Sequence, residues 1–250
     1  SKAYHGMGQL EERRGDYKRA MRYERESLSL ALTAEDPESQ ADAMTGLGHL
    51  LSQQGEFNQA DEMYRNSLTL YRQIGDRSGQ ANALNHLGHT PLVRGNLDKA
   101  DRFFEESWNL HRQVGDRYGE AKVLANRAHV AIKRGRAEEG ERMHTECLAI
   151  HMELDDPSGQ ARSEHNLGLV ALSLNDYDKA ERWFRKSLDL LQDIQDMDMH
   201  PVLSLGNITQ PCRPSVSVHL RATDIRRSPR KCKCLFWMTG SLLALDGEII

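Results

Sequence analysis

The sequence repeats with a period of 40 residues, and no other feature constrains the fold as strongly. Cutting it at every fortieth residue aligns five units without a gap: 1–40, 41–80, 81–120, 121–160 and 161–200. Within a unit we number the positions 1 to 40. Position 36 is aspartate in all five units, and position 8 is glycine in four of them. Periods of about 20 to 50 residues are typical of proteins that stack one supersecondary unit on the next.

Each unit predicts two helices. Apolar residues at positions 4, 7, 8 and 11 have the spacing of an amphipathic helix, and those at positions 20, 23, 24, 27, 28, 30 and 34 predict a longer second helix. Glycine or asparagine at position 15 separates the two, because these residues enter the left-handed conformation most easily. Aspartate at position 36 is expected to cap the next first helix, and Pro37 and Pro157 follow it in the first turn.

Neither helix of a unit can bury its apolar stripe alone, whereas stacked units share one core. We therefore expect an all-α fold, an α-solenoid of five helix-turn-helix units over residues 1–200. Glycine inside a helix costs about 1 kcal/mol relative to alanine, so the glycine at position 8 needs a compensating contact. We expect the small residues at positions 8, 20 and 27 to let paired helices approach closely.

The repeated residues resemble a known family. Leu-Gly at positions 7 and 8, alanine at 20, an aromatic at 23 or 24 and Ser-Leu at 27 and 28 resemble the tetratricopeptide repeat. The stretches GDRSGQANALNHLGH and GDRYGEAKVLANRAH are similar to the longer repeats of Pins/LGN scaffolds, kinesin light chains and bacterial signalling regulators. The resemblance covers residues 1–200 and implies a right-handed superhelix, whose first helices line a concave groove that binds a protein or peptide partner.

Members of this family contact their partners mainly through positions 2, 5, 6, 9 and 13 of the first helices. In this sequence these positions supply the candidate groove residues Asp42, His49, Asn82, Asn85, His86, His89, Lys122, Asn126, His129, Arg162, His165 and Asn166. Asparagine amides can donate and accept hydrogen bonds along a peptide backbone. Lys122 and Arg162 favour an acidic or phosphorylated ligand segment. We expect no strict carboxylate clamp, because only Asn126 matches that pattern outright.

Histidine recurs at position 9 of three successive units, as His49, His89 and His129. Neighbouring first helices lie about 10 Å apart, too far for adjacent histidines to share a zinc ion with bonds of about 2.1 Å. We interpret the ladder as polar groove residues and expect no metal and no cofactor. The sequence contains no H-E-x-x-H, no G-x-S-x-G and no phosphate loop, so an enzyme is the weaker class.

Arg127 is the main irregularity, because the other units carry methionine or leucine at its position 7. Ala137 and Gly140 are smaller than their counterparts and are expected to make room for it. Glu164, equally unusual at position 4 of the following unit, is the expected ion-pair partner. The alternatives are a polar site in the groove wall and a local ion pair without a function of its own.

Composition restricts the partner and the location. Residues 1–200 carry 26 Lys and Arg against 34 Asp and Glu, and an acidic body does not attract phosphate backbones, so we expect no nucleic acid partner. No stretch approaches the roughly 20 apolar residues of a membrane helix. Four cysteines are too few for a disulfide framework and favour a reducing, cytoplasmic location.

Residues 201–250 break the period and predict an irregular, disordered basic tail, with seven Lys and Arg against three Asp and Glu. Its cysteines Cys212, Cys232 and Cys234 lack the usual zinc-ligand spacing. The abrupt change after His200 suggests a fragment of a larger protein.

The sequence favours a non-catalytic scaffold that binds a peptide segment in its groove. One alternative is a regulatory or sensor module from a larger signalling protein, and the weaker one is a metal-dependent activity at the histidine ladder. The sequence does not predict an oligomeric state.

Overall fold

The computed structural model describes residues 1–199, with side chains through Ile194. This part of the chain consists of ten α-helices and contains no strand. The helices are α1 (Lys2–Arg13), α2 (Tyr17–Thr33), α3 (Pro37–Gln53), α4 (Phe57–Ile74), α5 (Arg77–Val93), α6 (Leu97–Val114), α7 (Arg117–Lys133), α8 (Ala137–Glu153), α9 (Pro157–Ser173) and α10 (Tyr177–Met199). The predicted all-α fold of five helix pairs is confirmed. The predicted tail, 201–250, lies outside the described residues.

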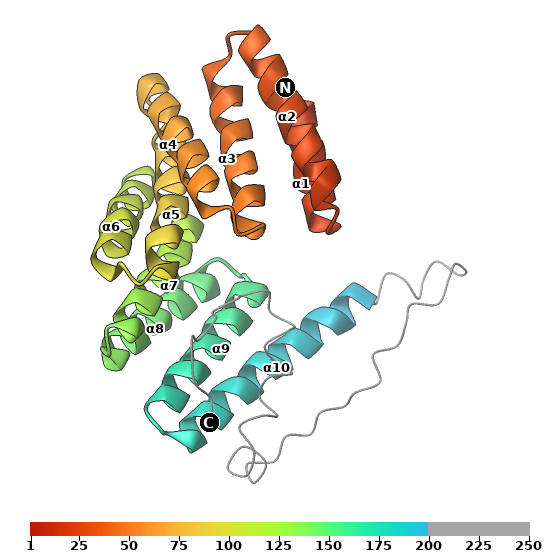
Figure 1. The fold of residues 1–250 in the computed structure, drawn as a ribbon. Helices are drawn as coiled ribbons and strands as arrows, with labels where there is room; N and C mark the ends of the chain where they lie inside the picture. The colour runs from red at the N-terminus through yellow and green to blue at the C-terminus, as the bar shows by residue number, and fades with distance from the viewer. Residues whose placement is uncertain (200–250) are drawn as a thin grey trace. The chain divides into compact units, whose positions relative to one another are not determined.

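Contacts within the chain divide it into two compact units, Ser1–Ile150 and His151–Ile250, and each is described by itself. In the first unit the helices pack in chain order, from α1 on α2 to α6 on α7 (Figure 1). Buried residues of α7 and α8 then form one cluster with Ala121, Leu124, Cys147 and Ile150. In the second unit α9 packs on α10. Consecutive helix pairs are thus stacked as an α-solenoid requires.

The predicted helix boundaries are confirmed by their hydrogen bonds. Asp76 Oδ1 accepts from the backbone N–H of Gly79 at 3.0 Å, and Asp116 Oδ1 from that of Gly119 at 2.9 Å. Asp36 and Asp156 cap α3 and α9 in the same way. The turn inside each unit has a left-handed residue at position 15, with φ angles of 60° to 81°: Gly15, Gly55, Gly95, Gly135 and Asn175.

Glycine at position 8 is explained by the side chain at position 24 of the same unit, which is Glu24 opposite Gly8 and an aromatic ring opposite the other three glycines. A Cβ atom on Gly48 would lie 2.7 Å from Tyr64 Cε1, and one on Gly168 would lie 2.6 Å from Phe184 Cε1. Gly88 meets the ring of Phe104 in the same manner. In these three units the close approach expected of the paired helices is therefore an aromatic ring lying on the glycine backbone.

Position 27 contributes a hydrogen bond as well as a small volume. Ser107 Oγ donates to the carbonyl of Ala81 at 2.7 Å, and Ser187 Oγ donates to that of Ala161 at 2.7 Å. In the fourth unit Cys147 Sγ lies 3.4 Å from the carbonyl oxygen of Ala121. In these units the side chain thus ties the second helix to the fifth residue of the first helix, whereas Ser67 Oγ donates to the carbonyl of Tyr64 in its own helix.

The units are joined by contacts between each second helix and the next first helix. Leu68 and Tyr71 of α4 lie in one buried cluster with Leu84 and Leu87 of α5. These four residues are at most 6% exposed. Stability in such an array is approximately a sum of the stabilities of single units and of the contacts between neighbours.

We predict opposite effects for two glycine-to-alanine substitutions in first helices. Gly48→Ala should lower the free energy of unfolding by about 1 to 3 kcal/mol, because the new methyl group collides with Tyr64. Gly6→Ala should raise it by up to about 1 kcal/mol, because a Cβ at Gly6 meets nothing within 4 Å and alanine favours the helix. Urea unfolding of both variants measures the difference. Equal changes in the free energy of unfolding would mean that the ring of Tyr64 is not the reason for glycine at position 8.

Candidate functional site

Within residues 1–150 the first helices of successive repeats form a row, because α1 contacts α3, α3 contacts α5, and α5 contacts α7. Nine of the predicted groove residues lie on three of these helices: Asp42 and His49 on α3, Asn82, Asn85, His86 and His89 on α5, and Lys122, Asn126 and His129 on α7. The other three, Arg162, His165 and Asn166, lie on α9 in the second unit. The nine residues on α3, α5 and α7 are therefore the candidate site, which we call the α3–α5–α7 row.

Two asparagines link α5 and α7. Asn126 Nδ2 donates to Asn85 Oδ1 at 2.8 Å and lies 3.5 Å from His89 Nε2. Asn85 is only 1% exposed, and its own Nδ2 has no hydrogen-bond acceptor among the described residues. Asn126 is half-buried and stands between this buried amide and the surface. Asn85 therefore positions Asn126, which is the more accessible of the two.

The histidines form a contiguous cluster, with His86 between His49 and His89. The ring centroids of His49 and His86 are 5.7 Å apart, and those of His86 and His89 are 6.3 Å apart. His86 also stacks on Tyr64, with centroids 4.9 Å apart and planes at 7°. Within the part of the chain that the structure describes, no three His, Cys, Asp or Glu side chains are arranged to hold a metal ion.

Burial keeps the imidazoles of His86, His89 and His129 neutral. Burial and, to a smaller extent, the nearby Lys122 ammonium lower the pKa of His89 to about 4. His86 has a pKa well below its usual range for the same two reasons. The pKa of His129 is lowered to about 4 by burial and by Lys133. At neutral pH Lys122 supplies positive charge in this row, whereas His86, His89 and His129 act as uncharged hydrogen-bonding groups.

Arg127 does not pair with Glu164, as its sequence position had suggested, but with Asp101 of α6. Its Nε lies 3.2 Å from Asp101 Oδ1, and Arg134 Nη1 lies 2.7 Å from the other oxygen of the same carboxylate. The guanidinium of Arg127 is also 5.8 Å from the ring centroid of Trp108. A Cβ on Gly140 would meet Ile132, so Gly140 accommodates that side chain instead of Arg127. Arg127 therefore belongs to the α6–α7 interface.

The first repeat contains a polar cluster that the repeat pattern did not predict. His5 Nδ1 lies 2.9 Å from Glu24 Oε2, and Gln9 Nε2 lies 2.9 Å from His5 Nε2. Glu24 is only 2% exposed, and burial raises the pKa of its carboxyl group. The hydrogen bond between His5 and Glu24 raises the pKa of His5. Glu24 stands at position 24, which holds a ring in the other four units, and this departure was the available indication.

Rings at position 31 were also missed. His111 Nδ1 lies 2.8 Å from Asp116 Oδ2, and His151 Nδ1 lies 3.0 Å from Asp156 Oδ2. Tyr71 has the same position and donates from its hydroxyl to Asp42 Oδ1 at 2.7 Å. These side chains connect the end of a second helix to a capping aspartate or to a groove residue.

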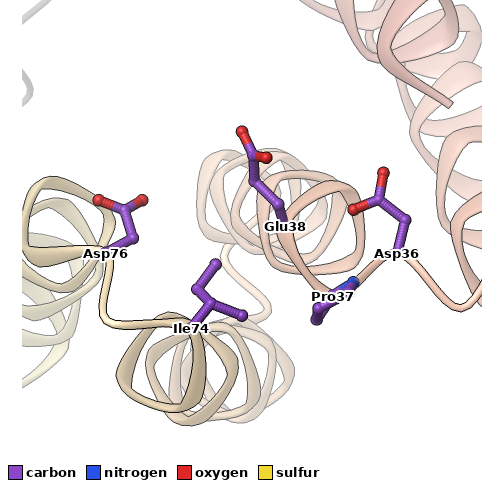
Figure 2. A pocket seen from close by; sticks show the side chains of 5 residues that line it. All are labelled: Asp36, Pro37, Glu38, Ile74 and Asp76. Atoms are coloured by element: carbon purple, nitrogen blue, oxygen red, sulfur yellow. The ribbon is translucent and has the colours of Figure 1, made fainter.

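A shallow hollow at the helix ends is a different place from the α3–α5–α7 row. Figure 2 shows that Asp36, Pro37 and Glu38 line it from the start of α3, and Ile74 and Asp76 line it from the α4–α5 junction. Its carboxylates have structural partners, since Asp36 and Asp76 cap helices and Glu38 lies 3.2 Å from Lys2 Nζ. The hollow contains none of the predicted groove residues.

Comparisons with known proteins agree with this architecture. The sequence profile of the tetratricopeptide repeat matches residues 39–113 and 119–193. No curated protein sequence matches the chain significantly. Within the described residues, no helix is long and apolar enough to cross a membrane.

Three solved structures illustrate the similarity of fold. BtubC (BKLC) from P. vanneervenii is 21% identical, with a TM-score of 0.64 over 86% of this chain and 84% of that one. A Rap protein complexed with Competence and Sporulation Factor is 15% identical, with a TM-score of 0.71 over 80% and 56% of the two chains. A STAND protein with a tetratricopeptide repeat sensor, from Pyrococcus horikoshii, is 17% identical, with a TM-score of 0.67 over 78% and 30%. At these identities the likeness shows the fold alone.

We predict that acid destabilises the protein through its buried histidines. His144 is 1% exposed, and burial lowers its pKa from 6.5 to about 3. The unfolded chain therefore binds a proton below pH 6.5 that the folded chain does not bind, so stability is lost as the pH falls through that value. Between pH 7 and pH 5 the loss is about 2 kcal/mol for such a histidine.

His144→Phe introduces phenylalanine at position 24, as in the third and fifth repeats, which have Phe104 and Phe184 there. It should reduce the loss of unfolding free energy between pH 7 and pH 5 by about 2 kcal/mol. Urea unfolding at pH 7 and pH 5 measures this change. Tyr64→Phe is the control, because it alters a ring at the same position that does not titrate in this range. A His144→Phe variant that is as acid-sensitive as the original chain would contradict the assignment.

Proposed function

Because this chain belongs to the tetratricopeptide repeat family, we propose that it is a protein-interaction scaffold that binds an extended peptide segment along the α3–α5–α7 row. The observation that carries the proposal is the Asn85–Asn126 hydrogen bond between adjacent first helices. It holds a half-buried amide in place on the row. A fixed amide of this kind loses little conformational freedom when it binds a peptide backbone.

The row separates backbone recognition from charge selection. His86, His89 and His129 are neutral at pH 7 and offer hydrogen bonds without attracting anions. Lys122 is exposed on α7, at position 2 of the fourth repeat, and its charge lowers the pKa of His86 and His89. The ligand segment that passes α5 and α7 is therefore acidic or phosphorylated, because Lys122 forms charge-assisted hydrogen bonds with such groups.

Three residues of α9 are included in the proposed binding site because they occupy equivalent positions of the repeat. Arg162, His165 and Asn166 of α9 occupy positions 2, 5 and 6, as Lys122 and Asn126 occupy positions 2 and 6 of α7. We assign them the same roles toward a ligand. The scaffold needs no cofactor and no catalytic group, and the expected cytoplasmic location stays a prediction.

The similar structures favour two settings for such a scaffold. The Rap protein of the same fold was solved in complex with Competence and Sporulation Factor, which supports binding of a separate partner. The STAND protein carries its repeats as a sensor, and this chain matches 30% of its length. The second candidate function is accordingly a sensor module that acts on other domains of a larger signalling protein. The same groove would serve in both settings.

We predict that reversing the charge of Lys122 weakens binding of acidic peptides. Peptides are first selected from a displayed random library against the full chain, and their affinities are then measured by calorimetry. Lys122→Glu should weaken an acidic binder at least tenfold, since about 1.4 kcal/mol corresponds to a factor of ten. Arg142→Glu is the matched control, because Arg142 is exposed on α8, a second helix outside the row.

Equal losses in the two variants would show diffuse attraction to the whole surface, and the groove assignment would then be withdrawn. A selected peptide without acidic residues would refute the charge preference but leave backbone recognition to be tested with Asn126→Ala.

A further inference from the structure

A first helix inside the array lies between two rings that belong to second helices. The ring at position 31 of the preceding second helix lies against position 39, at the start of the first helix. A Cβ on Gly79 of α5, for example, would collide with the ring of Tyr71. The ring at position 24 of the same pair lies against position 8, as Phe104 does against Gly88. α5 is therefore held by Tyr71 of α4 and Phe104 of α6.

Among the five first helices of the described chain, only α7 has an imidazole at both of these positions. His111 of α6 lies against Gly119 at the start of α7, where an added Cβ would collide with its ring. His144 of α8 lies against His129 of α7, with ring centroids 5.3 Å apart. The corresponding side chains are Ala31 and Tyr64 at α3, Tyr71 and Phe104 at α5, and His151 and Phe184 at α9.

His111 is 1% exposed and faces charged groups at the start of α7. Its Nδ1 lies 2.8 Å from Oδ2 of Asp116, the residue that caps α7. Burial lowers the pKa of His111, and Lys122 of α7 adds to this shift, whereas Asp116 and Glu120 oppose it. Because the net shift is downward, the imidazole stays neutral while α7 is in place.

His144 is also 1% exposed, and neither of its ring nitrogens has a hydrogen-bond partner among the described residues. Burial lowers its pKa to about 3, and His129 of α7 adds to this shift. A proton on His144 would place an unpaired charge between α7 and α8, which is strongly unfavourable. The charged ring becomes hydrated when α7 moves away from α8.

The histidines of α5 differ in this respect. The pKa values of His86 and His89 are also lowered by burial, but these side chains are half-buried and lie on the α3–α5–α7 row. Rotation of the side chain is enough to bring such a ring to water, and α5 itself is held by Tyr71 and Phe104. Protonation of His86 or His89 therefore does not require that α5 leaves its neighbours.

We propose that acid opens the array locally at α7: when His111 and His144 bind protons, α7 separates from α6 and α8 while the preceding repeats stay folded. Local opening is available to such an array because each repeat contacts only its neighbours. In the open state both imidazoles regain the ordinary pKa of about 6.5, so the open state gains stability as the pH falls below that value. Between pH 7 and pH 5, His144 alone multiplies the opening equilibrium constant about 25-fold.

The consequence for binding rests on the function proposed above. Lys122 and Asn126 lie on α7, so a peptide held between α5 and α7 loses half of its contacts when α7 opens. The protein would then bind its partner at neutral pH and release it in an acidic environment. Histidines that are buried in the neutral form are the usual basis of such pH-dependent release.

Hydrogen exchange of the full chain, measured by mass spectrometry and expressed as protection factors, tests the opening without any ligand. From pH 7 to pH 5 the protection of α7 should fall about 25-fold more than that of α3, which has no imidazole at either holding position. In the double variant His111→Tyr/His144→Phe, which carries the residue types that hold α5, this extra loss should be at least tenfold smaller. Equal losses in α3 and α7 of the original chain would overturn the proposal, as would an unchanged extra loss in the double variant.

His144→Phe alone serves as the second variant if circular dichroism shows that the double variant is unfolded. It leaves the His111–Asp116 contact in place and should still make the extra loss of protection at α7 at least tenfold smaller. An extra loss as large as that of the original chain would overturn the role of His144.

Calorimetry with a library-selected peptide tests the effect on binding. Between pH 7 and pH 5 the affinity of the original chain should fall at least tenfold more than that of the double variant, and this comparison cancels the titration of the peptide itself. Equal losses of affinity would overturn the control of binding by α7. Failure to select any peptide would instead refute the proposed function, whereas the exchange of α7 is measured without one.

Discussion

The contact between a second helix and the next first helix is the interaction on which the rest of the molecule depends. It buries positions 28 and 31 of one helix against positions 4 and 7 of the next, as Leu68 and Tyr71 do against Leu84 and Leu87. Burying an apolar side chain of this size contributes about 1.5 to 3 kcal/mol. The same contact leaves positions 2, 5, 6 and 9 of the first helices in a row, which is where the polar groove residues lie.

Departures from the repeat change the chemistry without changing the stack. Arg127 replaces an apolar residue at the α6–α7 interface and is accommodated because Asp101 accepts from both Arg127 and Arg134. Glu24 replaces a ring and is accommodated by His5. Each substitution removes apolar contact and introduces a partnered charge or hydrogen bond. Such pairs are only weak contributors to stability, but removal of one partner alone is strongly destabilising.

The sequence was sufficient for the helices and their ends, since each feature recurs in several units. The capping aspartates and the left-handed residue at position 15 follow from local chemistry that a single chain repeats. The ion-pair partner of Arg127 was predicted wrongly, because position 7 packs against the preceding second helix and the periodicity alone does not give that direction. Burial of Asn85 and the contact between His49 and His86 depend on side-chain directions, which the period of 40 residues does not specify.

The proposed function requires above all that a partner binds to the first helices. Nuclear magnetic resonance of the labelled chain, titrated with a library-selected acidic peptide, tests this claim directly. We expect the chemical-shift changes to concentrate on α3, α5 and α7 and to include the side-chain amide of Asn126. Changes concentrated on the second helices α4, α6 and α8 would contradict it.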